Sequence, residues 1–305
     1  MIRRLFSVLL FLFAAVGLWA QSAAVADPAA WQAELAAWRT AQEQQVSAPG
    51  GWLSLASLNW LKPGFNAVGS EPSSAVRLPQ SAPAKLGLIT LNGKTVQLLS
   101  PAGGFPAGLT LNGKPVREGQ LATSDASPSI LAWNGLQLVV LERAGRFVVR
   151  VKDENAPART GFHGLNWFLP DPQQVVVARW IPFHPAQTEE IPTPLGNPLE
   201  LPAPGLAMFL LHGKVYQLEP VVEEPQSLFF ILRDQTSQTT TFAGGRFLHT
   251  GLPNHGLDQP GTLVLDFNRL ENPPCAYSAL ATCPLAPEQN RLDTVIEAGE
   301  KRFLP

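Results

Sequence analysis

The side chains best suited to chemistry lie in the last quarter of the chain. They are three carboxylates, one arginine and two asparagines: Asp234, Arg246, Asp266, Asn268, Asn272 and Glu300. Two carboxylates at one site act as acid and base when their environments separate their pKa values. A pocket built from these residues would use Asp266 and Glu300 as catalytic groups. Asp234, Arg246, Asn268 and Asn272 would then bind the ligand.

The same residue types also have structural uses. Asp234 can cap a turn with Thr236, Asp266 can pair with Arg246, and both asparagines can bond to their own backbone in Asx turns. Two hypotheses therefore stay open. The first is a non-catalytic protein that binds a small molecule or a protein partner, and the second is a hydrolase-type enzyme with an Arg/Asp/Asn/Glu pocket. The first is preferred, because the motifs fit turn chemistry as well as catalysis.

Cys275 and Cys283 are the only cysteines, spaced C-x7-C between prolines. In an oxidising compartment this spacing predicts a disulfide that closes a short loop. A zinc site that adds His249 and His255 would match no standard spacing, so no metal is expected. The chain also lacks the Gly-x-Ser-x-Gly elbow and the glycine-rich phosphate loops, so no cofactor is expected.

The first 26 residues have the layout of a secretory signal peptide. Arg3 and Arg4 precede an apolar run over residues 5–19, and Ala24-Val25-Ala26 forms an A-x-A cleavage pattern. This layout predicts a periplasmic or secreted protein without stable membrane insertion after cleavage. Charged residues make up only 15% of the chain and its net charge is −2, so no nucleic-acid partner is expected.

The elements that must position these residues begin with a helix over residues 27–49. Asp27 is an N-cap ahead of Pro28, and Trp31, Leu35 and Trp38 recur on one helical face. This apolar face is expected to pack on the body of its own protein.

Beyond the helix, turn residues recur every 8 to 12 positions, which is typical of an all-β chain. Asn92-Gly93 and Asn112-Gly113 predict type I′ hairpins, and His212-Gly213 predicts another hairpin. Prolines crowd residues 157–172 and 182–204, which are expected to be connectors or sheet edges because proline lacks an amide donor. The sequence thus predicts a mainly β fold, with a β-sandwich over residues 50–160 packed closely against a second β-rich domain over residues 161–305.

The C-terminal motifs resemble those of a known prokaryotic family. They include Leu265-Asp266-Phe267-Asn268-Arg269, Asn272-Pro273-Pro274-Cys275-Ala276-Tyr277 and Ala298-Gly299-Glu300-Lys301. Gly51-Trp52-Leu53-Ser54-Leu55 adds an N-terminal signature. Together they look like the family catalogued as domain of unknown function 1684, with Phe242 where tyrosine is expected. The resemblance implies boundaries and candidate residues but no activity.

Residues 64–152 are similar to a forkhead-associated β-sandwich. The order of a Gly64–Gly69 strand, a strand ending at Arg77, and the run Leu111 to Val116 carries this similarity. That fold binds phosphothreonine through an arginine and a serine–histidine pair. Here Ser70 follows Gly69 and no histidine precedes His163, so the resemblance implies a domain without the phosphopeptide site.

Overall fold

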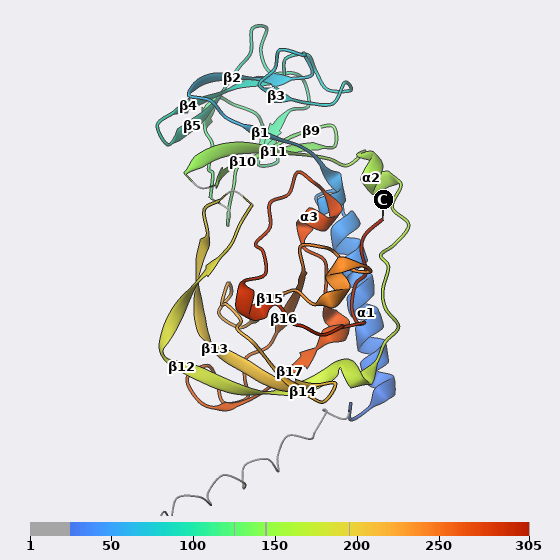
Figure 1. Ribbon diagram of the computed structural model, residues 1–305. Helices are drawn as coiled ribbons and strands as arrows, with labels where there is room; N and C mark the ends of the chain where they lie inside the picture. Colours follow the sequence, from blue (N-terminus) through green and yellow to red (C-terminus); the bar gives the residue numbers. More distant parts are fainter. Residues whose placement is uncertain (1–24, 125, 144, 195, 305) are drawn as a thin grey trace, which may run out of the picture.

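The computed structural model describes residues 25–304 except residues 125, 144 and 195 (Figure 1). The signal peptide predicted for residues 1–26 therefore lies, up to residue 24, outside the described residues. Strands dominate the described part, where one long helix stands beside two β-rich parts. This confirms the mainly β prediction. No helix in the described part is both long and apolar enough to cross a bilayer.

The N-terminal part is a sandwich of two sheets. The first has the strand order β1-β11-β10-β9-β6-β7 and the second has the order β3-β2-β4-β5-β8. The strands are β1 (Leu55–Trp60), β2 (Gly64–Gly69), β3 (Val76–Arg77), β4 (Gly87–Asn92), β5 (Thr95–Leu99), β6 (Thr110–Leu111), β7 (Lys114–Pro115), β8 (Gly119–Gln120), β9 (Ile130–Trp133), β10 (Leu136–Arg143) and β11 (Arg146–Asp153).

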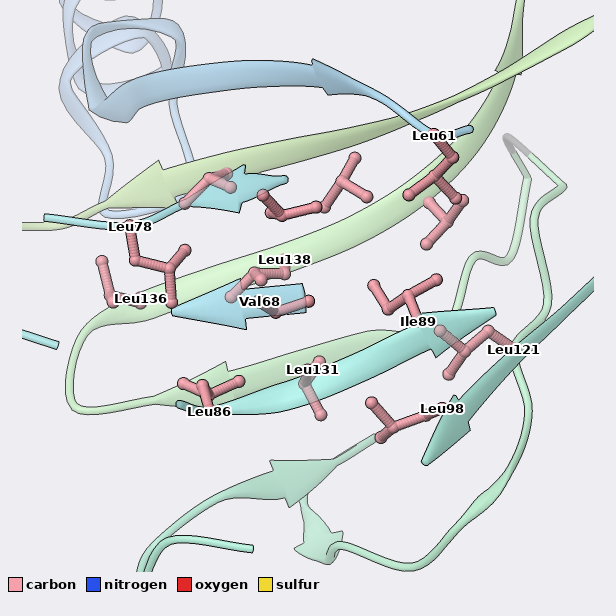
Figure 2. Packing of buried hydrophobic residues seen from close by; sticks show 14 of the residues in the cluster. Leu61, Val68, Leu78, Leu86, Ile89, Leu98, Leu121, Leu131, Leu136 and Leu138 are labelled. Atoms are coloured by element: carbon pink, nitrogen blue, oxygen red, sulfur yellow. The ribbon is translucent and has the colours of Figure 1, made fainter. Parts of the chain in front are cut away.

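Branched aliphatic side chains fill the space between these two sheets. Figure 2 shows Val68 and Ile89 from one sheet facing Leu131 and Leu138 from the other. All four side chains are at most 2% exposed. Successive residues of a strand point to opposite faces, so each strand contributes every second side chain to this core.

The hairpin turns follow the predicted chemistry with one exception. Asn112 and Gly113 have φ of 51° and 73°, and His212 and Gly213 have φ of 49° and 78°, as a type I′ turn requires. At the Asn92-Gly93 hairpin the type I′ prediction is wrong. Asn92 is the last residue of β4, so Gly93 is the first loop residue, and its φ of 59° is the positive angle that a type II′ turn needs.

The C-terminal part contains a four-stranded sheet of order β14-β13-β12-β17 and the pair β15-β16. Its strands are β12 (Val175–Ile191), β13 (Leu199–Leu211), β14 (Lys214–Leu218), β15 (Leu228–Leu232), β16 (Arg246–Thr250) and β17 (Gly261–Asp266). Trp180, Phe209, Phe230 and Leu248 fill the core between them. Short helices complete the chain: η1 (Trp52–Ser54), α2 (Pro157–Thr160), η2 (Pro172–Gln174), η3 (Gln235–Gln238), η4 (Phe267–Arg269), α3 (Pro274–Tyr277) and η5 (Glu288–Asn290).

The proline-rich stretch over residues 182–204 forms the outer end of the β12–β13 hairpin, which agrees with the predicted sheet edge. Among the described residues, β12 pairs with β17 only over Val175–Trp180, and β13 pairs with β14 only over Ala207–Leu211, so each strand has one unpaired edge in this stretch. β12 continues through Pro182 and Pro185, and β13 contains Pro202 and Pro204. The pairing between these two strands shifts register between Pro182 and Gln187. Pro185 and Pro204 lie within this irregularity and outside the regular ladder, so their missing amide donors cost no sheet hydrogen bonds there.

Helix α1 (Pro28–Ser47) confirms the predicted N-terminal helix and its packing. The Asp27 side chain accepts hydrogen bonds from the amides of Ala29 and Ala30. Trp31 and Leu35 pack against Val175, and the indole Nε1 of Trp31 donates to Asp266 at 2.9 Å. α1 therefore lies along the C-terminal part and reaches the sandwich only at its end, as Figure 1 shows.

We expect Leu35→Ala to lower the free energy of unfolding by about 2–5 kcal/mol, because it opens a cavity under α1 where Leu35 is 1% exposed. Chemical denaturation measures this change. Gln32→Ala, on the exposed face of the same helix, is the control and should stay within about 0.5 kcal/mol of the wild type. Equal effects of the two substitutions would show that α1 is not anchored through Leu35.

Candidate functional site

The site is built on one face of β16. In the β15–β16 pair, His249 lies opposite Phe229. On the other side of β16, Glu271 forms a bridge with Phe247, with backbone hydrogen bonds of 2.9 and 3.0 Å. Residues that face each other across a pair, and residues two apart along a strand, share a face of the sheet. Phe229, Phe247, His249 and Glu271 therefore lie on the same face.

Helix α1 forms the opposite wall of a cleft over this face. Trp38, Gln42 and Gln45 follow at i, i+4 and i+7, so one side of α1 presents all three. Two adjoining hollows, of about 320 and 310 Å³, share Gln42, Gln45, His249 and Glu271 among their lining residues. The larger hollow also includes Trp52, Glu223, Asn272, Tyr277 and Cys283, and the smaller one includes Trp38 and Arg269. We call this pair of hollows the α1–β16 cleft.

His249 and Glu271 form the polar centre of the cleft. His249 Nε2 lies 3.6 Å from Glu271 Oε1, and its ring stacks on Phe229 with centroids 4.6 Å apart. Burial, with a contribution from nearby Glu300, raises the pKa of Glu271 to about 7. Burial lowers the pKa of His249 below its ordinary 6.5. Glu271 can therefore gain or lose a proton near neutral pH while a neutral imidazole faces it.

Glu300 lies beneath the cleft and is 1% exposed. Its carboxylate accepts hydrogen bonds from the Asn272 amide at 2.8 Å, from Asn272 Nδ2 at 2.7 Å, and from the Tyr277 hydroxyl at 2.8 Å. Burial raises the pKa of Glu300 to about 7, although these hydrogen bonds act in the opposite direction. Burial and the neighbouring Glu300 raise the pKa of Tyr277, so its hydroxyl stays protonated and donates.

Asn272 connects this buried network to the cleft. Its Nδ2 donates to Glu300 and to the carbonyl of Lys301, both of which are acceptors, so the orientation of the amide is fixed. Its Oδ1 is buried and has no hydrogen-bond partner among the described residues. The residue is 5% exposed and lines the larger hollow. Of the six polar candidates from the sequence, Asn272 is the one that lines the cleft.

Asp234 and Arg246 form an enclosed ion pair at 2.7 Å, with both side chains 1% exposed. Arg246 also donates to the carbonyls of Ile296 and Ala298. The expected pairing of Asp266 with Arg246 is therefore wrong, because Asp234 and the carbonyls of the C-terminal segment occupy the guanidinium. Asp234 does bond to Thr236, as expected, at 2.8 Å to its amide. Neither member of the pair lines the cleft.

Asp266 and Asn268 hold other segments in place. Asp266 accepts from Trp31 and from both the amide and Nδ2 of Asn268, and it lies 3.5 Å from Arg269. Asn268 makes two 2.9 Å hydrogen bonds to the backbone of Asp171, instead of the expected Asx turn. No described residue hydrogen-bonds to both Asp266 and Glu300. The structure thus holds these two carboxylates in separate networks, and their catalytic role stays a prediction.

The predicted disulfide is not present, since Cys275 and Cys283 are free thiols. The backbone amide of Cys275 donates to Sγ of Cys283 at 2.9 Å, so the two residues are neighbours without a covalent bond. Cys275 follows Pro274 in the first turn of α3, where its amide needs an acceptor outside the helix, and the sulfur supplies one. Across the described residues, no three His, Cys, Asp or Glu side chains are grouped so that they could hold a metal.

Sequence reasoning missed Glu271 and treated His249 only as a possible zinc ligand. Glu271 lies between Arg269 and Asn272, which belong to two of the recognised C-terminal motifs, and this position in the sequence could have identified it as a candidate. Nothing in the sequence distinguishes Gln42 and Gln45, because polar side chains are common on a surface helix. Only the bridge between Phe247 and Glu271 and the packing of α1 bring these residues together.

The fold and the cleft define a mainly β protein with a polar cleft in its C-terminal part. Residues 160–301 match the model of the family described as protein of unknown function (DUF1684). The match confirms the resemblance seen in the C-terminal motifs. No curated protein matches the chain.

Among solved structures, an uncharacterised protein from Haloarcula marismortui, determined by solution NMR, is 32% identical. The match covers 47% of this chain and 78% of that one, with a TM-score of 0.40. Two forkhead-associated (FHA) domains match at 21% identity and a TM-score of 0.21, each covering 31% of this chain and 92% or 97% of its own. One was analysed for phosphothreonine-dependent interactions and the other is the FHA domain of FhaA.

We expect Asp234→Ala to lower the free energy of unfolding by about 3–5 kcal/mol, because it leaves the buried Arg246 charge without its partner. Denaturant titration measures the change. Asp293→Ala is the matched control: its partner Lys214 and Asp293 itself are mostly exposed, so the effect should be much smaller. Similar losses in the two variants would show that the Asp234–Arg246 pair is not a main support of the fold.

We expect Glu271→Gln to reduce the loss of stability that occurs as the pH rises toward 7. The pKa values of Glu271 and Glu300 are raised from the ordinary 4.5 to about 7, so the native state holds more protons than the unfolded state between these values. The free energy of unfolding therefore falls as pH rises across that range, by at most about 1.4 kcal/mol per pH unit for each group.

The measurement is the difference in unfolding free energy between variant and wild type at several pH values from 4.5 to 8. Taking the difference removes the opposite contribution of His249, whose lowered pKa favours the folded state at higher pH. Glu288→Gln, which removes a side chain that is 91% exposed, should run parallel to the wild type. A Glu271→Gln curve parallel to the wild type would contradict the raised pKa.

Proposed function

We propose that this protein binds a small polar molecule in the α1–β16 cleft. The observation that carries the proposal is the cleft itself. It combines space for a small ligand with aromatic walls, two glutamines from α1 and the facing pair of His249 and Glu271. Ligand sites typically have about 300–1,000 Å³ of space, apolar walls and a few converging polar groups with shifted pKa values. A non-catalytic binding role uses all of these features.

A second candidate is a hydrolase-type reaction in the same cleft. It is supported by the pKa of Glu271, which is raised to about 7, and by the neutral imidazole 3.6 Å away. A general acid or base works best when its pKa is close to the working pH. In this version Glu271 would exchange the proton, whereas Asp266 and Glu300 would hold the surrounding segments. Turnover that is lost in Glu271→Gln while ligand binding persists would favour this candidate over simple binding.

Export is also part of the proposal, and it rests on the sequence of residues 1–26. Cleavage after Ala26 would leave Asp27 as the first residue and so keep the side chain that caps α1. The ligand would then be met in the periplasm or outside the cell. N-terminal sequencing of protein recovered from the native host tests this point.

The binding proposal is tested by blocking the cleft. A library of small polar metabolites is screened by thermal shift, and each hit is then titrated calorimetrically against the wild type, Gln42→Trp and Gln44→Trp. Gln42 lines both hollows, whereas Gln44 lies on the exposed side of the same helix. We expect Gln42→Trp to weaken binding at least about tenfold. The indole of the introduced tryptophan occupies space in the cleft, so the ligand loses contacts that contribute about 1.4 kcal/mol or more. Gln44→Trp should bind like the wild type.

Circular dichroism and thermal melts establish that both variants are folded before binding is compared. Hits that bind equally well to Gln42→Trp and to the wild type would place the ligand elsewhere and contradict the proposal. A screen with no hit at all would also count against it.

A further inference from the structure

We propose that the ligand of the α1–β16 cleft is a cation, specifically an organic amine that places its ammonium group beside Glu271 and Asn272. This inference deepens the proposed function and rests on it. It is carried by three independent properties of the cleft: an excess of carboxylates, a buried acceptor without a donor, and aromatic walls.

Carboxylates outnumber cations around the cleft. Glu271 and Glu223 line the larger hollow, and Glu300 lies directly behind Asn272 and Tyr277. Arg269 is the one arginine or lysine that the structure places in the lining of either hollow. It is already engaged, at 3.5 Å from Asp266 and 3.8 Å from Glu34. Among the arginines and lysines of the described residues, none is therefore free in the lining to balance Glu271 and Glu223.

The unpaired acceptor is Oδ1 of Asn272. Leaving a buried polar atom without a hydrogen bond costs about 1–3 kcal/mol. Asn272 is 95% buried and lines the larger hollow, and its Nδ2 is held by Glu300 and Lys301, so Oδ1 is the side-chain atom left without a partner. An oxygen acceptor needs a donor. An ammonium group supplies up to three donors and the missing positive charge together, whereas a carboxylate or a phosphate would supply neither.

The walls of the cleft suit a cation with an organic body. Trp52, Phe229, Phe247 and Tyr277 line the larger hollow, and Trp38 lines the smaller one. The faces of aromatic rings attract cations, and their edges and faces pack well against hydrocarbon. A bare metal ion would gain nothing from these walls. An amine on an apolar or aromatic frame would use both the charged floor and the walls.

Binding of a cation should also be linked to the proton on Glu271. Titratable and charged groups face Glu271 from several elements: His249 from β16, Arg269 from η4, Tyr277 from α3, Glu300 from the C-terminal segment and Glu223 from the loop before β15. Helix α1 contributes only the neutral Gln42 and Gln45. The raised pKa of Glu271 means that it is partly protonated near pH 7, and an ammonium group favours its ionised form. Affinity for a cation should therefore increase as pH rises from 6 to 8.

The test uses three probes of one shape and different charge: benzylamine, benzyl alcohol and benzoate. Each is titrated into the full mature chain and followed by protein NMR or calorimetry. We expect benzylamine to bind at least about tenfold more tightly than benzyl alcohol, which corresponds to about 1.4 kcal/mol from the added ion pair and ring contacts, and benzoate to bind most weakly. Benzylamine stays protonated from pH 6 to 8, so its increase in affinity over this range reports on the protein.

Two substitutions connect the charge preference to the cleft. Glu271→Gln should reduce the affinity for benzylamine about tenfold, remove most of its pH dependence, and leave benzyl alcohol unchanged. Glu223→Gln, at the exposed rim, should have a smaller effect of the same sign and is a second variant if Glu271→Gln folds poorly. Glu288→Gln removes an exposed carboxylate outside the cleft and should bind all three probes as the wild type does.

The inference is overturned if benzyl alcohol or benzoate binds as tightly as benzylamine, or if benzylamine shows no saturable binding at millimolar concentrations. Neutral or anionic metabolites that are blocked by Gln42→Trp would, in that case, leave the proposed function standing while the inference fails. Benzylamine binding that Gln42→Trp does not weaken would instead overturn both, because the probe would then bind outside the cleft.

Discussion

The enclosed ion pair between Asp234 and Arg246 is the interaction on which the C-terminal part depends. The two terminal nitrogens of the planar Arg246 guanidinium join Asp234 to the carbonyls of Ile296 and Ala298. These bonds hold the backbone at Ala298, two residues before Glu300. The position of Glu300 in turn fixes Asn272 and Tyr277, which form the floor of the cleft. The charged residues of the recognised motifs thus act mainly through the segments that they hold.

The cleft also depends on the attachment of α1. Two anchors hold the helix, one through Trp31, Leu35 and Asp266 and one through Val46 in a cluster with Leu53, Leu165 and Tyr277. Tyr277 therefore has two functions, because its ring belongs to the helix anchor and its hydroxyl to the Glu300 network. Packing and hydrogen bonding are coupled at this residue, so Tyr277 joins one anchor of α1 to the Glu300 network.

The sequence predicted the parts of the fold that depend on local chemistry. The cap at Asp27, the apolar face of α1 and the positive φ angles at Asn112-Gly113 are local properties, and the structure confirms them. The partner of Arg246 and the state of the two cysteines depend on contacts between residues that are not neighbours in sequence, and there the prediction was wrong. The candidate residues were recognised as important, but Glu271 was missed, because its role follows from a bridge to Phe247 that no spacing reveals.

In the order of the chain, the sandwich lies between the two segments that form the cleft. α1 precedes it and the matched family region, residues 160–301, follows it, yet α1 and that region share the cleft. The sandwich begins and ends at one place, where β1 pairs with β11 and the Arg159 guanidinium donates to the carbonyl of Ser47 at 2.8 Å. Along the chain the sandwich therefore lies between two segments that line the same cleft. A fragment made of residues 160–301 alone would lack the wall of the cleft that α1 supplies.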